Sequence, residues 1–169
     1  CILSSSKTIA DDNSFLTCRI LGLEKCSPVR IILDKRLETS IRSNVVKTAY
    51  KYRTIIFFNR NNKKKIKALR NLKIKLVRTS LKADGNFDIR KILCKIKKFG
   101  FSRIFLESGI KLTTFFLREN LVDDFHLYIS GKKLGINGSN NFIKFIKLFF
   151  KNKIPINEKV NLHEDKLIT

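Results

Sequence analysis

The sequence predicts an α/β domain with a mostly parallel central sheet and helices on both faces. Short apolar runs rich in β-branched residues, such as residues 54–58 (TIIFF), alternate with segments of helical periodicity, such as residues 89–99. Continuous apolar runs are typical of buried parallel strands, and strand–helix alternation builds a parallel sheet. A chain of 169 residues can bury a sizeable core, so we expect one domain over residues 1–169.

The first half of the chain contains three predicted strands and one predicted helix. Residues 29–34 form an apolar run that ends in an acid, and residues 54–58 form a second run of strand-forming residues. No clear periodicity is present between these two runs. Residues 63–72 place apolar side chains on one helical face, and residues 74–77 then alternate as a strand does.

The second half continues the alternation. Asp88 can cap a helix over residues 89–99, and Gly100 should end it. Residues 103–107 follow as the next predicted strand, and the turn at residues 108–109 leads into another helix. We expect a further strand within residues 122–129. The stretch over 142–150 fits a short helix or a short strand equally well.

The formal net charge of +22 suggests a nucleic-acid partner but admits a second explanation. The basic residues are 25 lysines and 11 arginines, and the lysines are spread over nearly the whole chain. They accompany abundant Ile, Asn and Phe, which are the amino acids of A/T-rich codons, so coding bias alone could produce the charge. No helix-turn-helix, RNP-like or zinc-finger signature accompanies it, which makes a nucleic-acid partner the less favoured explanation.

Other compositional features indicate a cytoplasmic protein with reduced thiols. No apolar stretch approaches the roughly 18 residues of a membrane helix, and no secretion signal is present. The four cysteines form no C-x-x-C pair, so neither a zinc nor a redox motif is indicated, and Cys94 fits a small core residue. The chain begins with Cys1 and contains no Met, which predicts a piece of a longer product.

One candidate ligand-binding segment follows a predicted strand at residues 106–111 (LESGIK). Ligands bind beyond the carboxyl ends of the strands in such sheets. Gly109 has no side chain to obstruct a ligand, and the free amides of the following helix favour an anionic group. Glu107 could accept hydrogen bonds from hydroxyl groups, and Lys111 could add a charge. An ordinary strand–turn–helix junction would have the same sequence.

A second candidate segment is residues 7–19 (KTIADDNSFLTCR). Its acid pair, Asp11 and Asp12, lacks the further ligands that a metal site would need. Arg19 invites a phosphate partner, because the guanidinium group can bind phosphate with two hydrogen bonds. A loop in which the aspartates satisfy local amides is the simpler explanation.

Taken in order, four blocks and a short tail resemble the C-terminal reductase domain of the bifunctional riboflavin-biosynthesis deaminase/reductase. Residues 8–19 resemble the block T-x-x-x-D-N-P-x-L-T-x-R, and residues 28–34 resemble P-x-R-x-x-L-D. Residues 107–117 resemble E-G-G-x-x-L-x-x-x-F-L, and residues 121–129 resemble L-V-D-E-x-x-x-Y-I. Residues 133–135 are similar to the L-x-G that follows in the family.

The resemblance implies a dihydrofolate-reductase-like fold and an enzyme that uses NADPH. The implied reaction reduces 5-amino-6-(5-phosphoribosylamino)uracil, a phosphoribosylaminopyrimidine, to its ribityl product by hydride delivery to ribose C1′. By position in the blocks, the implied cofactor contacts are Thr8, Asp12, Gly109, Ile110, Lys111, Leu112, Thr113, Thr114 and Phe115. The implied substrate contacts are Leu16, Arg19 and Glu107. No residue is assigned as the acid or base, and no metal is expected.

The chain also departs from the family pattern. Ser14 stands where the family commonly has Pro, and Ser108 replaces a usual Gly. The strand and loop that normally open the domain, and the zinc-deaminase motifs, are not among these residues, so we expect the domain to lack its first strand and any upstream deaminase. Related enzymes assemble through this domain, which makes a homodimer an expectation. A basic nucleic-acid-binding module and a reductase of another pteridine- or pyrimidine-like substrate are the alternatives.

Overall fold

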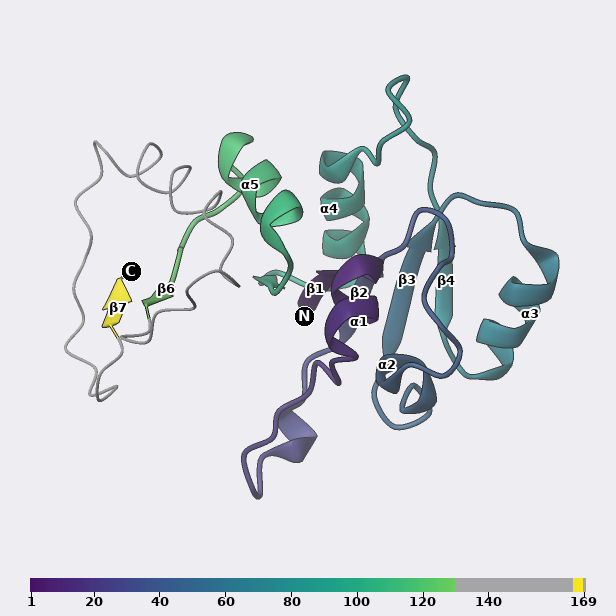
Figure 1. The fold of residues 1–169 in the computed structure, drawn as a ribbon, viewed down its shortest axis with the longest axis horizontal. Helices are drawn as coiled ribbons and strands as arrows, with labels where there is room; N and C mark the ends of the chain where they lie inside the picture. The colour runs from purple at the N-terminus through teal and green to yellow at the C-terminus, as the bar shows by residue number, and fades with distance from the viewer. Residues whose placement is uncertain (130–165, 169) are drawn as a thin grey trace, which may run out of the picture. The chain divides into compact units, whose positions relative to one another are not determined.

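The computed structural model describes residues 1–129 and 166–168 of the chain. The chain forms two compact units that divide after Gly109. In the first unit, five strands form one sheet in the order β4-β3-β2-β1-β5, and every pairing in it is parallel (Figure 1). The strands are β1 (Ile2–Ser5), β2 (Arg30–Leu33), β3 (Thr54–Phe58), β4 (Lys75–Arg78) and β5 (Phe105–Leu106). This confirms the predicted parallel α/β sheet.

One face of this sheet is covered by α1 (Ser6–Asp12), α2 (Asn44–Lys47) and α3 (Lys63–Asn71). Registered neighbours in a parallel sheet point to the same face, and successive residues alternate between faces. The strand side chains on this face pack with apolar side chains of the three helices and their connections, which bury them almost completely. The members of this core are Ile2, Ile9, Leu16, Ile32, Leu37, Val45, Val46, Ala49, Ile56, Phe58, Leu69 and Ile74.

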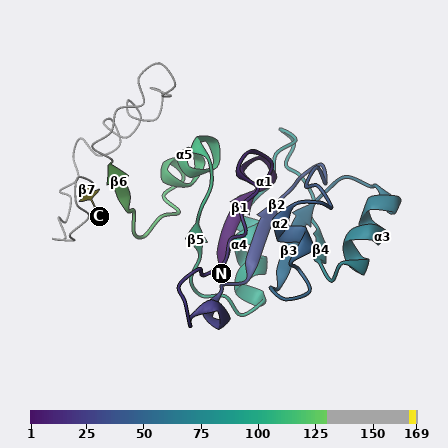
Figure 2. The ribbon, with the colours of Figure 1, turned by 60° about the horizontal axis from the view of Figure 1, so that its bottom comes forward.

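The opposite face carries α4 (Ile89–Lys98). Phe57 follows Ile56 in β3 and therefore points to this other face, where its ring lies 6.4 Å from the ring of Phe99. Ile92 and Ile96 of α4 are fully buried. Figure 2 shows α4 behind the strands and α1 and α2 in front of them. The expectation of helices on both faces is therefore confirmed.

Both predicted ends of α4 are confirmed. The Asp88 carboxylate caps the helix by accepting a hydrogen bond from the backbone N–H of Lys91 at 3.1 Å. At the other end, Gly100 has a φ of 92°, a conformation that glycine adopts without steric cost. The N–H of Gly100 donates to the Lys97 carbonyl and that of Phe101 to the Ile96 carbonyl. These two bonds form a Schellman motif.

One strand and two α-helices of the first unit were not predicted from the sequence, and neither was the short 3-10 helix η1 (Glu24–Cys26). Residues 2–5 form a central strand, residues 6–12 form α1 and residues 44–47 form α2. The interpretation of residues 7–19 as a loop is therefore wrong for its first half, which is helical. The assignment of Cys94 to the core is also wrong, because this side chain lies on the exposed face of α4.

The described part of the second unit contains α5 (Ile110–Arg118), β6 (Leu127–Ile129) and β7 (Lys166–Ile168). Strands β6 and β7 pair antiparallel, with Tyr128 opposite Leu167. The strand predicted within residues 122–129 therefore begins only at Leu127. The predicted element over 142–150 and the tail at 133–135 lie outside the described residues. Within residues 1–129 and 166–168, none of the helices has the length and apolar character needed to cross a bilayer.

Candidate functional site

The strand order places the candidate site where the chain changes direction across the sheet. From β1 the chain moves outward through β2 and β3 to β4, and then returns through α4 to β5 on the other side of β1. Connections that leave in opposite directions open a crevice beyond the carboxyl ends of the two adjacent strands, where α/β proteins bind their ligands. In this sheet the two strands are β1 and β5, followed by residues 5–8 and 107–109.

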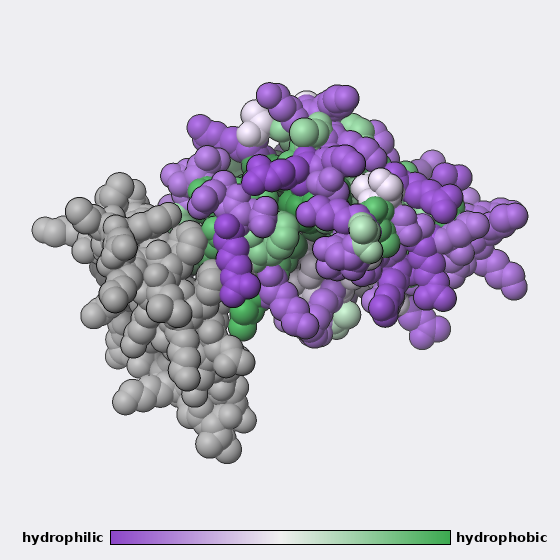
Figure 3. All heavy atoms as spheres, turned by 90° about the horizontal axis from the view of Figure 1, so that it is seen from above, coloured by the Kyte–Doolittle hydropathy of each residue, from purple (hydrophilic) through white to green (hydrophobic). Residues whose placement is uncertain are grey.

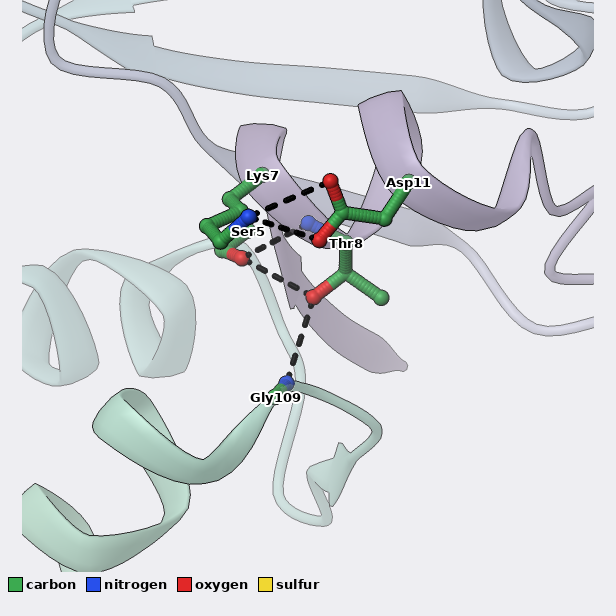
Figure 4. Close-up of polar contacts among 5 residues, drawn as sticks. All are labelled: Ser5, Lys7, Thr8, Asp11 and Gly109. Atoms are coloured by element: carbon green, nitrogen blue, oxygen red, sulfur yellow. Dashed lines mark hydrogen bonds and ion pairs between the residues drawn. The ribbon is translucent and has the colours of Figure 1, made fainter. Parts of the chain in front are cut away.

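These two segments meet at Thr8 and Gly109. The backbone N–H of Gly109 donates a hydrogen bond to Thr8 Oγ1 at 3.2 Å (Figure 4). Thr8 Oγ1 also lies 3.0 Å from Ser5 Oγ, which caps α1 by accepting from the Thr8 N–H at 3.2 Å. The structure therefore joins two of the residues that the sequence marks as cofactor contacts, although 101 residues separate them.

Gly109 leaves open space beside its backbone. A Cβ atom placed on Gly109 would have no heavy atom of another residue within 4 Å. Its φ lies outside the left-handed range, so the backbone conformation does not itself require glycine. Neither local packing nor backbone geometry therefore explains the glycine at this position.

The acid pair in α1 has two different environments. Asp11 forms an exposed ion pair with Lys7, one turn earlier, with 2.8 Å between Nζ and Oδ2. The hydrogen bond to Asp11 and the negative charge of its carboxylate raise the pKa of Lys7. Asp12 is exposed at the end of the helix. In the part of the chain that the structure describes, no cluster of three or more His, Cys, Asp or Glu side chains could hold a metal ion.

Residues 13–16 form a tight connection after α1. Asn13 ends the helix with a φ of 46°, and Leu16 has a φ of 52° although its side chain is buried. Asn13 Oδ1 accepts a hydrogen bond from the Asn44 N–H at 2.9 Å, and Asn44 Nδ2 donates to the Asn13 carbonyl at 2.8 Å. Leu16 is thus held in the core, whereas Arg19 further along lies exposed.

Arg30 was missed as a site-related residue in the sequence, where it belongs to a predicted strand and to the family block at residues 28–34 without an assigned role. Its side chain is fully buried at the start of β2, and it is the one buried Lys or Arg among the described residues. Burial lowers its pKa to about 10, so the guanidinium remains protonated at neutral pH. It donates to the Phe15 carbonyl, immediately before Leu16, at 3.0 Å.

The remaining predicted residues lie at and after the end of β5. Glu107 is exposed, and its backbone N–H donates to the Leu3 carbonyl at 3.0 Å, which extends the pairing of β5 with β1. Residues 110–115 are the first six residues of α5, so the amides at the start of this helix follow Gly109 directly in the chain. Lys111 is exposed within that first turn.

The positive charge is spread over the described surface. Basic side chains of α3 and α4 and of several loops are exposed. On the face shown in Figure 3, hydrophilic side chains cover most of the coloured surface and leave only small apolar areas between them. This distribution agrees with lysines scattered along the sequence.

Comparisons with solved structures establish the fold. The chain is similar to Acinetobacter baumannii RibD, form 2, with a TM-score of 0.71 and 16% identity over 99% of this chain and 45% of that one. It is also similar to the riboflavin biosynthesis reductase Rib7 of Saccharomyces cerevisiae, with a TM-score of 0.68 and 16% identity over 99% of this chain and 72% of that one. The predicted dihydrofolate-reductase-like fold is therefore confirmed.

Sequence comparisons give the family. The chain is 30% identical over 167 residues to the riboflavin biosynthesis protein RibD of Aquifex aeolicus, covering 99% of this chain and 45% of that protein. It is 28% identical over 172 residues to the 5-amino-6-(5-phosphoribosylamino)uracil reductase of Buchnera aphidicola, covering 94% of this chain and 78% of that protein. The chain thus spans less than half the length of the RibD relative. The model of the RibD C-terminal domain family matches residues 1–145. The chain therefore belongs to this family.

Proposed function

We propose that this chain is an NADPH-dependent reductase of riboflavin biosynthesis. The reaction reduces 5-amino-6-(5-phosphoribosylamino)uracil to the corresponding ribitylamino compound, with hydride delivered to ribose C1′. Membership of the RibD C-terminal domain family supports this assignment, as does the relative in Buchnera, which is named for that reductase. The proposal covers the pyrimidine reduction and does not include deamination.

The hydrogen bond between Gly109 and Thr8 is the observation that carries the proposal. It brings the two segments with the most specific family blocks together beyond the carboxyl ends of β1 and β5. That position is the switch point of the sheet, where the general rule for open α/β sheets puts the ligand. The site is therefore supported by sheet topology and by the family blocks independently.

One structural observation supports a dinucleotide at this site. The space beside the Gly109 backbone is open, and a side chain there would occupy it without any conflict inside the protein. Glycine at such a place is explained by the approach of a ligand to the backbone. We assign the cofactor to Thr8, Asp12, Gly109 and residues 110–115, where the amides that begin α5 favour an anionic group. NADPH would supply the hydride in this site.

The substrate is assigned to Leu16, Arg19 and Glu107. The exposed guanidinium of Arg19 suits the substrate phosphate, because it can donate two parallel hydrogen bonds to phosphate oxygens. Leu16 presents its backbone in an unusual conformation that the buried side chain fixes. The Glu107 carboxylate can accept hydrogen bonds from sugar hydroxyls near the reacting carbon. The protein thus contributes mainly positioning and electrostatics.

NADPH consumption by the purified full chain tests this function. The chain is mixed with NADPH and the phosphoribosylaminopyrimidine, and nicotinamide absorbance is followed with and without substrate. We expect oxidation that depends on the substrate, and NADPH binding by calorimetry in its absence. A chain that binds no NADPH, or that oxidises it only with a pteridine such as dihydrofolate, would refute the proposed function.

The oligomeric state and the location stay predictions. We propose a homodimer acting in the cytoplasm, with residues 1–169 as a reductase domain. Light scattering coupled to size-exclusion chromatography would give the mass of the particle directly. A mass of one chain at assay concentration would refute the dimer without affecting the proposed reaction.

A further inference from the structure

Among the residues that the structure describes, Arg30 is buried without an acidic partner. None of the acceptors of its guanidinium is a carboxylate: they are the carbonyl oxygens of Phe15, Val45 and Tyr52 and the hydroxyls of Thr48 and Thr54. A buried charge is costly even when hydrogen-bonded, and burial here lowers the pKa of Arg30. A neutral apolar residue at the start of β2 would avoid that cost.

The guanidinium satisfies its donors by joining separate parts of the chain. Nε and Nη2 donate to Thr54 Oγ1 in β3 at 3.0 and 2.6 Å, and Nη2 also donates to the carbonyls of Val45 and Tyr52 around α2. Nη1 donates to Thr48 Oγ1 at 2.8 Å and to the Phe15 carbonyl at 3.0 Å. The bond to Phe15 is the one that reaches the connection after α1.

A second set of bonds holds the same connection from its other end. Asn44 donates two hydrogen bonds to Asn13, from its N–H to Oδ1 at 2.9 Å and from Nδ2 to the backbone carbonyl at 2.8 Å, and these tie the end of α1 to the start of α2. Ser14 lies between the Asn13 and Phe15 attachments. The family commonly has Pro at this position, and a proline would restrict the backbone there by itself. In this chain Ser14 lacks that restriction, and bonds from Arg30 and Asn44 hold the backbone on either side of it.

We propose that Arg30 is a positioning residue that, together with the Asn13–Asn44 pair, fixes residues 13–19 in the conformation that binds the substrate. The inference rests on the proposed function, because Leu16 and Arg19 are assigned there to the substrate. The Phe15 carbonyl directly precedes Leu16, so the hydrogen bond from Arg30 acts on the backbone whose φ is 52°. Such a conformation persists only where the surroundings fix it.

The planar fork of arginine is what this arrangement requires. Lysine would retain a positive charge but offers one nitrogen, which cannot replace the three guanidinium nitrogens that donate to separate acceptors. Arg30→Lys should therefore release the Phe15 carbonyl even in chains that still fold. Asn13→Gly removes the Oδ1 acceptor, and with it one of the two bonds of the other attachment, while the bond from Asn44 Nδ2 to the Asn13 carbonyl remains. It keeps the positive φ accessible and removes only an exposed side chain.

The test combines hydrogen–deuterium exchange of the peptide covering residues 13–19 with steady-state kinetics. It uses the full chain and the variants Arg30→Lys and Asn13→Gly. Asn120→Gly is the matched control, because Asn120 is also exposed and has a φ of 50°. Thr48→Val is the control for Arg30, because it removes a half-buried acceptor of the same guanidinium without removing the Phe15 acceptor.

We expect Arg30→Lys and Asn13→Gly to speed exchange in residues 13–19 by about tenfold and to raise the KM for the pyrimidine about fivefold. The KM for NADPH should change less than the KM for the pyrimidine, and both controls should leave the exchange of this peptide unchanged. Should Arg30→Lys fail to fold, Arg30→Gln, which puts no charge into the buried site, takes its place, and Asn13→Gly tests only the second attachment.

Two results would overturn the proposal. One is unchanged exchange of residues 13–19 in the folded Arg30 variant, and the other is faster exchange in that variant with an unchanged KM for the pyrimidine. Hydrogen–deuterium exchange needs no substrate, so it tests whether residues 13–19 are held in place even if the wild-type chain shows no turnover. Absence of turnover in a wild-type chain with a protected loop would instead refute the proposed function, and with it the positioning of substrate.

Discussion

The N–H of Gly109 donates to Thr8 Oγ1 at 3.2 Å, and this hydrogen bond joins the ends of two strands that are neighbours only in space. Strands β1 and β5 pair side by side although their sequences are about a hundred residues apart. The topology of the sheet therefore brings together two loops that the sequence could mark only separately. Each prediction about the cofactor below depends on this contact.

Replacing Thr8 tests the hydroxyl that accepts from Gly109. Thr8→Val keeps the shape of the side chain but removes the acceptor, so the Gly109 segment loses its attachment to α1. We expect NADPH to bind about fivefold more weakly, which corresponds to one ordinary hydrogen bond. Thr8→Ser retains the hydroxyl and serves as the control. Equal affinities for the Val and Ser variants in calorimetric titration would contradict the assigned role.

Substitution of Gly109 separates ligand approach from folding. The position has open space for a Cβ and no positive φ, so Gly109→Ala and Gly109→Val should unfold close to the wild-type temperature. Both side chains would occupy the space assigned to the cofactor. We expect NADPH affinity to fall about tenfold for Ala and further for Val, because overlap with a bound ligand grows with side-chain size. Unchanged NADPH affinity in the Val variant would refute the placement.

Arg19 is tested by removing its charge and, separately, the phosphate of the substrate. Arg19→Ala should weaken substrate binding roughly tenfold or more, which is the typical contribution of a charge-assisted hydrogen bond. The affinity for NADPH should change little. With a substrate lacking the phosphate, wild type and variant should show the same KM. Lys25→Ala removes another exposed charge nearby in the sequence and should change neither constant. Equal losses for substrate and cofactor would contradict the phosphate role of Arg19.

The cap of α4 predicts a pH dependence of stability. The backbone hydrogen bond from Lys91 holds the pKa of Asp88 below its ordinary value of 3.8. A carboxyl with a depressed pKa stabilises the fold above its unfolded pKa, and this contribution is lost as the pH falls through the folded value. Asp88→Ala should therefore lower Tm at neutral pH, with a difference from wild type that shrinks below pH 3.8. A difference independent of pH, measured by thermal unfolding, would show that the charge is not involved.

Periodicity was sufficient for the elements that bury a regular apolar pattern. The strands at residues 30–33, 54–58 and 75–78 and helices α3 and α4 were all predicted within a few residues. The caps of α4 followed from Asp88 and Gly100, because these residue types satisfy the backbone groups at helix ends in known ways.

The elements that were missed lack such a pattern. Helix α1 buries Ile9 alone, so no periodicity marks it, and the Ser5 cap has no apolar run behind it. Helix α2 is four residues long and contains two β-branched valines, which favour strands. Strand β1 has two serines in four residues and is buried because neighbours cover both of its sides. Tertiary context decides all three cases.

The sequence predicted the two segments of the candidate site separately, but it did not predict that they lie together. Residue types at positions 8, 12, 19, 107 and 109 were informative, whereas the contact between Thr8 and Gly109 follows only from the order of the strands. Two sequence features pointed to Arg30, its place as the Arg of the family block at residues 28–34 and its charge inside a predicted strand. A charged residue inside a predicted buried strand must find partners, and the sequence gives no indication of which carbonyls those are.

Transfer of an isotope label from the cofactor tests the central claim most directly. The full chain is incubated with 5-amino-6-(5-phosphoribosylamino)uracil and NADPH that is fully deuterated at the nicotinamide C4, and the product is analysed by mass spectrometry. The account predicts a ribityl product that carries one deuterium, located at C1′. Product without deuterium, or no ribityl product while the chain remains folded, would contradict the assignment of this chain as the reductase.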